Sequence, residues 1–352
     1  MVKKGDSNGK PVIGVTMGDP LGIGPEVLVR ALAHTDSIGP AHFVIYGSNE
    51  VLTLNADRLG IRPTWSRIPH DSARLDRPID EKIVVKDFEQ PESLRICDPG
   101  PTPAGGQLSK TFVERAIEDA LRKEDDPRHI DGIVTAPINK QSWAMAGSRF
   151  TGHTELLAHR TRARRHTMLF HSKQLTVALA TAHVPLMDLR NILTIGKVFD
   201  PIDLGNKFCI DLGIKTPRIA VCGVNPHAGE NGLIGDEDQR IVAPAIEMAR
   251  NTGIDAHGPF PADTIFIGAA AGEWDLVVAM YHDQGLIPVK LLGWRDAVNV
   301  TTGIPLIRTS PDHGTAFDIA GKGDADPSSM IASLQLAVRL GSRRRALRPH
   351  KE

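Results

Sequence analysis

Residues 12–26 read VIGVTMGDPLGIGPE, an apolar strand pattern that runs into a glycine-rich turn and then into the start of a helix. Pro25 suits the first turn of that helix. Backbone N–H groups in such a turn can face an anion, but a tight strand-to-helix connection needs the same glycines. The turn is not the dinucleotide-binding fingerprint, because Val27 occupies the position of its third glycine. Both interpretations of the turn stay open at this point.

Further strand patterns alternate with longer helical patterns, as is typical of a mostly parallel sheet covered by helices. We therefore predict an α/β fold. The strand patterns are Val12–Thr16, Phe43–Tyr46, Ile83–Val85 and Gly132–Thr135. The helical patterns are Leu108–Arg122, opened by Gln107 and Ser109, then Asp236–Arg250, and Pro327–Leu340, which Asp326 can cap.

The composition is that of a globular protein large enough for two packed domains: 352 residues, 41% hydrophobic, 24% charged and 5% aromatic. The formal net charge is -1, so we expect no electrostatic attraction to nucleic acid or to a membrane surface. No stretch approaches the roughly 20 apolar residues that cross a bilayer. Cys97, Cys209 and Cys222 are too widely spaced for a disulfide framework or a thiolate zinc site. We expect a cytoplasmic protein that acts on small molecules.

Three histidines, His183, His227 and His282, each follow an apolar, strand-like run. Ligand sites in open α/β sheets lie just beyond the carboxyl ends of the strands. Imidazole suits zinc, cobalt, nickel and iron, and three protein ligands with a vacant position are typical of a catalytic metal. Each histidine alone could equally be structural. The three runs are Leu175–Ala180, Arg218–Val224 and Asp275–Met280.

Other polar side chains suggest an anion site. His153 and Thr154 precede a helical pattern, where amide donors and the helix dipole favour a phosphate or carboxylate, although Thr151 or Thr154 could instead cap the helix. A second group lies in apolar, strand-like surroundings. Because a buried cation is costly unless paired, its basic members should meet either structural carboxylates or an anionic ligand. This group is Lys290, Asn299 and Arg308.

Two carboxylates accompany these candidates, Asp263 within Pro261–Thr264 and Asp283 next to His282. Either can orient an imidazole or position a lysine, and either can cap a helix. His313 is a weaker candidate for a fourth metal ligand, and we interpret it as a structural or cofactor-loop residue.

Five motifs occur in order along the chain: Gly18–Glu26, Thr151–Glu155, Asn225–Glu230, Tyr281–Gly285 and Pro311–Asp318. Together they resemble the 4-hydroxythreonine-4-phosphate dehydrogenase family of the vitamin B6 pathway and its paralogues that act on D-threonate or D-erythronate 4-phosphate. The resemblance implies two α/β domains arranged as in isocitrate and isopropylmalate dehydrogenases, with the site in an interdomain cleft. We place the first domain at residues 1–140 with 306–352, and the second, which would carry the dimer interface, at 141–305.

The resemblance also implies the reaction. An NAD-dependent enzyme, with NADP as an alternative, would oxidise the C3 hydroxyl of 4-phosphohydroxy-L-threonine and release carbon dioxide, giving 3-amino-2-oxopropyl phosphate. A divalent metal, zinc first and magnesium or cobalt as alternatives, would be held in a homodimer by His183, His227 and the partner's His282.

The substrate residues implied by the resemblance are His153, Thr154, Lys290, Asn299 and Arg308, with Asp263 and Asp283 as supporting carboxylates. Lys290 is then our candidate for proton transfer, and Asp263 is the second.

Two alternatives remain. Gly18–Pro20 and Thr135–Lys140 look more like the paralogues that oxidise D-threonate or D-erythronate 4-phosphate, whose product would be dihydroxyacetone phosphate. A metal chelates a C2 amine or a C2 hydroxyl almost equally well, so the C2 substituent of the substrate stays open. In another reaction class, a metal-dependent phosphatase or lyase would use the same histidines to activate water.

Overall fold

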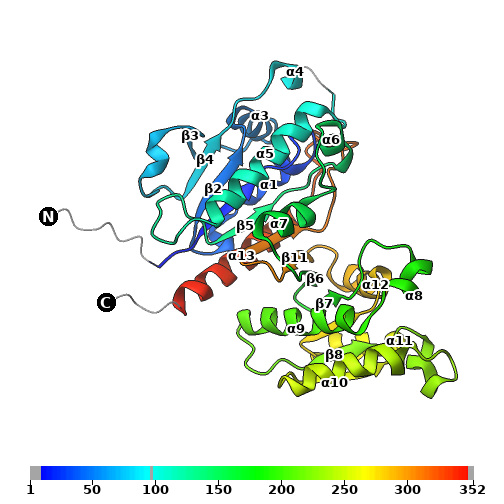
Figure 1. The fold of residues 1–352 in the computed structure, drawn as a ribbon. Coiled ribbons are helices and arrows are strands. Elements are labelled where there is room, and N and C mark those ends of the chain that lie inside the picture. The colour runs from blue at the N-terminus through cyan, green and yellow to red at the C-terminus, as the bar shows by residue number, and fades with distance from the viewer. Residues whose placement is uncertain (1–8, 96–97, 348–352) are drawn as a thin grey trace. The chain divides into compact units, whose positions relative to one another are not determined.

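The computed structural model describes residues 9–95 and 98–347, so Cys97 lies outside the described residues (Figure 1). The chain divides into two compact units, a first of residues 9–162 and 305–347 and a second of residues 163–304. Both units alternate strands and helices, which confirms the predicted α/β class.

The first unit is built on a parallel sheet with the strand order β3-β4-β2-β1-β5-β12. The apolar patterns predicted as strands form its centre, where both faces are covered by helices and Ile13, Phe43 and Val134 are buried. The strands are β1 (Val12–Thr16), β2 (His42–Gly47), β3 (Ser66–Pro69), β4 (Ile83–Asp87), β5 (Gly132–Thr135) and β12 (Ile307–Pro311). The helices are α1 (Gly24–Leu32), α2 (Thr35–Ile38), α3 (Asn49–Leu59), α4 (Glu92–Arg95), α5 (Pro103–Ala120), α6 (Lys140–Met145), α7 (His153–Thr161) and α13 (Ser328–Ala346).

Helices α6 and α7 belong to the first unit, whereas the predicted boundary places residues 141–162 in the second domain. Both helices contact α5. Trp143 of α6 is fully buried there, and its indole Nε1 donates to the hydroxyl of Ser109 at 3.0 Å. This buried contact anchors the segment to the first unit.

The second unit is built on a mixed sheet with the strand order β11-β6-β7-β10-β8-β9. β6 pairs antiparallel with both β11 and β7, whereas β7, β10, β8 and β9 run parallel. The strands are β6 (Thr167–His171), β7 (Thr176–Leu179), β8 (Ile219–Cys222), β9 (Ala256–Phe260), β10 (Leu276–Ala279) and β11 (Val298–Thr302). The helices are α8 (Leu189–Ile192), α9 (Ile195–Asp211), α10 (Ala243–Asn251), α11 (Ala262–Ala270) and α12 (His282–Gly293), with a π-helical turn over Asp238–Val242.

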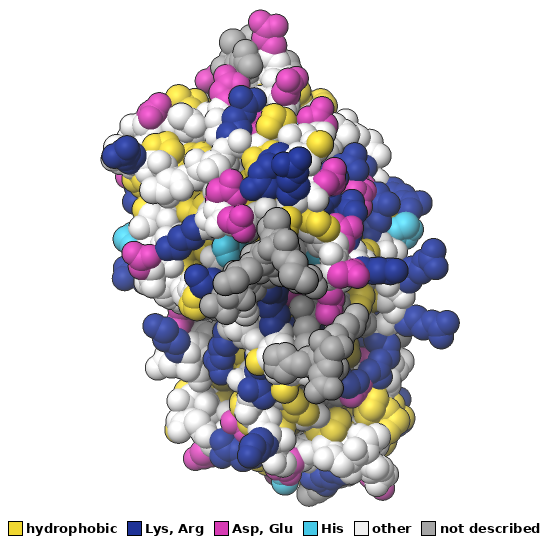
Figure 2. Space-filling model, turned by 90° about the vertical axis from the view of Figure 1, so that its left-hand side faces the viewer, with side chains coloured by type: hydrophobic (Ala, Val, Ile, Leu, Met, Phe, Trp, Pro, Cys, Tyr) yellow, Lys and Arg dark blue, Asp and Glu magenta, His cyan; other side chains and the backbone are white. Residues whose placement is uncertain are grey.

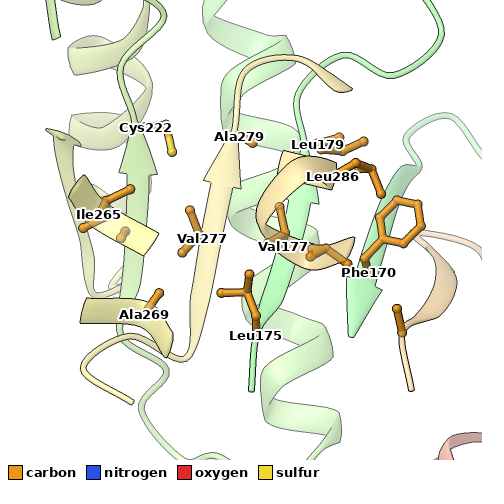
Figure 3. Packing of buried hydrophobic residues seen from close by; sticks show 13 residues of the cluster. Phe170, Leu175, Val177, Leu179, Cys222, Ile265, Ala269, Val277, Ala279 and Leu286 are labelled. Carbon is orange, nitrogen blue, oxygen red and sulfur yellow. The ribbon is translucent and has the colours of Figure 1, made fainter. Parts of the chain in front are cut away.

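Buried apolar side chains fix α11 and α12 against this sheet (Figure 3). Leu286 and Val289 of α12 lie in one cluster with Val177 of β7 and Val277 of β10. Burying each such side chain stabilises the unit by roughly 1.5–3 kcal/mol. The packing holds α12, which begins at His282, on the sheet.

Three predicted helices begin at other residues than expected. α5 starts at Pro103, because the hydroxyl of Thr102 accepts a hydrogen bond from Gly105 N at 3.0 Å and caps the helix ahead of Gln107 and Ser109. The pattern predicted over 236–250 starts as a π-helical turn before α10. In α13, Pro327 is the N-cap residue, while Asp326 accepts from Ser328 N at 2.9 Å.

The prediction that Lys290 lies in a strand-like segment was wrong, because this residue lies in the last turn of α12. Apolar residues occur on both faces of the helix: Val289 is buried, whereas Ile287 and Leu291 are exposed. This distribution hides the helical period in the sequence. Asn299 and Arg308 do lie in strands, β11 and β12.

Basic and acidic side chains are intermixed over the face seen in Figure 2, in keeping with the net charge of -1. Within the described residues, no helix is both long enough and apolar enough to span a membrane.

Candidate active site

The three histidine-bearing segments begin at one edge of the second unit's sheet. β7, β10 and β8 are parallel neighbours, so their carboxyl ends lie side by side. His183, His282 and His227 follow these three strands in that spatial order. The sequence prediction that each histidine lies just past a buried strand is confirmed.

His183 and His282 share a cavity of about 280 Å³. Their ring centroids are 5.7 Å apart and the ring planes are inclined by 37°. Nδ1 of His282 lies 2.7 Å from a carboxylate oxygen of Asp283, which leaves Nε2 to face a ligand. A carboxylate that orients an imidazole in this way is a usual neighbour of a metal ligand, so these residues fit a divalent metal.

His227 lies on a left-handed turn that follows β8. Residues 227–231 all have positive φ, from 46° at Glu230 to 81° at Gly229. Such a run is costly for residues other than glycine and persists only where its surroundings hold it. The buried carboxylate of Asp238 contributes by accepting from Val224 N at 2.7 Å and Asn225 N at 3.1 Å.

The described part of one chain brings together two of the three predicted metal ligands. Its His, Cys, Asp and Glu side chains include no group of three placed to hold a metal ion. His227 does not line the cavity that His183 and His282 share.

A cationic group lies in the first unit. Arg308 of β12 is 4% exposed, and its Nε and Nη2 donate to the hydroxyl of Thr135 at 3.2 and 2.8 Å. Burial lowers the pKa of Arg308 to about 10, so the guanidinium stays charged at neutral pH. Burial, and then the charge of Arg308, hold the pKa of His153 well below its usual range.

His153 begins α7, and Gly152 is its N-cap residue, so neither Thr151 nor Thr154 caps the helix. Nε2 of His153 is shielded from solvent, and no described residue hydrogen-bonds to it. The ring meets Trp143 edge-on with a centroid separation of 5.6 Å. A neutral imidazole beside a buried guanidinium can accept from and orient a polar ligand at this helix N-terminus.

The remaining predicted site residues lie in the second unit. Lys290 places its Nζ 5.3 Å from the ring centroid of Trp294. Asp263 and Asp283 occupy the first turns of α11 and α12, where a negative charge favours the helix, and neither is an N-cap residue. Asn299 pairs with Phe170 across β11 and β6.

The glycine-rich turn after β1 serves close packing. A Cβ on Gly18 would lie 2.3 Å from Pro137 O, and one on Gly24 would lie 2.4 Å from Met17 O. Gly24, Pro25 and Glu26 are buried at the start of α1. These contacts support the tight strand-to-helix connection.

The sequence reasoning missed polar residues that act on backbone or on another side chain. The sequence patterns mark Thr135 only as one residue of a motif, and they predict no separate role for Thr181, Asp238 or Gln284. The available signal was a polar residue at the end of a buried strand or at the first turn of the helix that follows.

Comparison with known proteins identifies the family. Residues 40–337 match the family described as "Pyridoxal phosphate biosynthetic protein PdxA". The chain belongs to the PdxA family. The predicted resemblance is thereby confirmed, and this PdxA-family protein is an oxidoreductase.

Its similarity to individual PdxA relatives covers nearly the whole chain. It is 44% identical to the D-threonate 4-phosphate dehydrogenase of Salmonella typhimurium, over 93% of this chain and 98% of the relative. It is 42% identical to the 4-hydroxythreonine-4-phosphate dehydrogenase of Desulfosudis oleivorans, over 94% and 96%. The crystal structure of a 4-hydroxythreonine-4-phosphate dehydrogenase from Klebsiella pneumoniae has a TM-score of 0.81 and 39% identity, over 95% and 98%.

Proposed function

We propose that this protein oxidises the C3 hydroxyl of a 4-phosphorylated four-carbon acid with NAD and a divalent metal, and that the resulting β-keto acid loses carbon dioxide. The candidate substrates are 4-phosphohydroxy-L-threonine and its 2-hydroxy counterparts, D-threonate and D-erythronate 4-phosphate. The main structural support is a site suited to an anionic substrate. The guanidinium of Arg308 is buried beside His153, the residue that begins α7. The names of the family relatives supply the substrate class.

The anionic ends of the substrate would be held by His153, Thr154 and Arg308. A guanidinium with a fixed direction suits phosphate or carboxylate, and the N-terminus of α7 adds backbone amide donors. We also propose Lys290 and Asn299 as substrate-binding residues. Lys290 is our first candidate to accept the hydroxyl proton, and Asp263, in the first turn of α11, is the second.

The metal would be held by His183, His227 and His282, with zinc as the first candidate and magnesium or cobalt as alternatives. The contact between His282 and Asp283 supports this assignment, because a carboxylate that orients an imidazole is a usual neighbour of a metal ligand. When bound, the metal supplies Lewis-acid polarisation and the nicotinamide accepts hydride.

We further propose a homodimer in which the partner's His282 completes the set. Ile287 and Leu291 of α12 and its C-cap residue Trp294 form an apolar stripe at helical spacing, and they are 59%, 80% and 71% exposed. Exposed apolar stripes of this kind are typical of protein interfaces. A second copy of the chain would cover the stripe and bring the third histidine.

A parallel assay tests the proposal. Purified protein with NAD and zinc, cobalt or magnesium is given each of the three 4-phosphorylated acids, and both NADH and inorganic phosphate are measured. NADH formation from one acid supports the dehydrogenase and identifies the C2 substituent. Phosphate release without NADH from any of them would instead establish the metal-dependent phosphatase.

A further inference from the structure

Side-chain hydrogen bonds connect the segments that follow β7, β10 and β8. The regular ladder between β10 and β7 ends at Ala279 and Leu179, and the ladder between β10 and β8 ends at Val278 and Val221. The histidines come after these points. Backbone pairing within the sheet therefore does not by itself fix the three segments that carry them.

Beyond the ladder, the Met280 peptide is the centre of a chain of hydrogen bonds. Its carbonyl accepts from the hydroxyl of Thr181 at 2.7 Å, and its N–H donates to the amide oxygen of Gln284 at 2.6 Å. The amide nitrogen of Gln284 then donates to the carbonyl of Gly223 at 2.8 Å. Thr181, Met280 and Gly223 are buried, so water cannot readily replace these partners.

Each of the three segments that these hydrogen bonds connect carries one of the histidines. Thr181 follows β7 and precedes His183, Met280 follows β10 and precedes His282, and Gly223 follows β8 and precedes His227. Gly223 directly precedes Val224 and Asn225, whose N–H groups donate to Asp238. Gly223 also packs closely against the left-handed turn, because a Cβ on Gly223 would lie 2.7 Å from Cα of Ala228. A shift of the Gly223 carbonyl would therefore be passed to the turn that carries His227.

We propose that Thr181 and Gln284 are positioning residues that hold the three histidine-bearing segments in register, Thr181 between the first two and Gln284 between the second and third. The proposal rests on the proposed function in so far as it takes the histidines as metal ligands. Neither side chain would touch the metal or the substrate. Through the Met280 peptide they set the spacing of His183 and His227, which would serve one site, and they place His282 for the partner subunit's site.

The test measures metal binding and not turnover. Gln284→Met keeps the length of the side chain and removes both hydrogen bonds, and Thr181→Val keeps the shape and removes the hydroxyl. Zn²⁺ affinity is measured by competition with a chelator, and the Co²⁺ absorption spectrum reports the ligand geometry. Each variant should bind Zn²⁺ about ten- to hundred-fold more weakly, as do other losses of residues that orient metal ligands, and its Co²⁺ spectrum should change.

Two controls separate positioning from a general loss of stability. Thr181→Ser keeps the hydroxyl and should restore the wild-type affinity and spectrum. Gln335→Met makes the same substitution at an exposed amide-to-carbonyl bond, to Ser37 O at 2.9 Å in the first unit, and should leave both unchanged. Folded Gln284→Met and Thr181→Val proteins with wild-type affinity and spectrum would overturn the proposal.

Hydrogen exchange distinguishes failure of this inference from failure of the proposed function. If the wild type binds no divalent metal, the metal assignment fails. In that case, faster amide exchange over residues 223–235 and 281–285 in Gln284→Met, with exchange elsewhere unchanged, would still support the positioning role. Unchanged exchange in those segments would contradict it.

Discussion

Arg308 donates from both Nε and Nη2 to a single acceptor, the hydroxyl of Thr135, at 3.2 and 2.8 Å. β12 and β5 are parallel neighbours in the first unit, so the acceptor and the guanidinium are held by adjacent strands. The hydroxyl of Thr135 therefore helps to set the direction of the buried cation. If Arg308 binds an anionic end of the substrate, the hydroxyl of Thr135 should matter for substrate affinity.

Replacing Thr135 by valine should raise KM for the 4-phosphorylated substrate about ten- to hundred-fold, the usual worth of a hydrogen bond to a charged group. The effect on kcat should be smaller, because Thr135 orients a binding residue. Steady-state kinetics of Thr135→Val and of Thr135→Ser, which keeps the hydroxyl, check this. An unchanged KM in Thr135→Val would show that the hydroxyl does not serve substrate binding.

Stability should fall as the pH is lowered below about 6.5, the ordinary pKa of histidine. Burial and the charge of Arg308 hold the pKa of His153 well below that value, and burial lowers the pKa of His313 as well. Between the folded and unfolded pKa values the unfolded chain binds more protons, so unfolding is favoured as the pH falls. Urea unfolding at a series of pH values should show a shallower dependence in His153→Gln. An equal dependence of unfolding free energy on pH in the wild type and in His153→Gln would contradict the lowered pKa of His153.

Mixed dimers should reveal how the histidines are divided between subunits. If His183 and His227 work with the partner's His282, co-expressed His183→Ala and His282→Ala chains should recover about a quarter of wild-type activity, because half of the dimers are hybrids with one intact site. His183→Ala with His227→Ala should recover none. Because His282 also lies near its own chain's His183, this arrangement would place both sites near the two-fold axis.

The opposite pattern would contradict that division. Recovery only from His183→Ala with His227→Ala would mean that His183 and His282 act within one chain, as their shared cavity would allow, and that the partner supplies His227.

Cys209 and Cys222 should be inert in the native protein. Burial raises the pKa of each thiol to about 12, so little thiolate forms at neutral pH. In a Cys97→Ser background, iodoacetamide should modify neither residue until the protein is unfolded, as read by mass spectrometry. Rapid modification of either thiol in the folded protein would show that its surroundings open in solution.

The sequence predicted the strands and the strand-end histidines because a buried strand is visible as an apolar run with a polar break after it. It did not predict the roles of Thr181 and Gln284, because their partners are backbone atoms of Met280 and Gly223, which carry no sequence signal. It misplaced Lys290 because α12 has apolar residues on its exposed face as well as on its buried one. Strands and their ends could be predicted because they follow the hydrophobic pattern. Hydrogen bonds between particular side chains and backbone atoms could not be predicted, because they depend on the three-dimensional structure.

The most direct test of the central claim is the stoichiometry of NADH and carbon dioxide formed from the preferred 4-phosphorylated acid. Oxidation at C3 followed by loss of the carboxyl group predicts one carbon dioxide for each NADH, with the phosphate retained on the product. Neither NADH nor carbon dioxide from any of the three acids, with inorganic phosphate released in their place, would contradict the account.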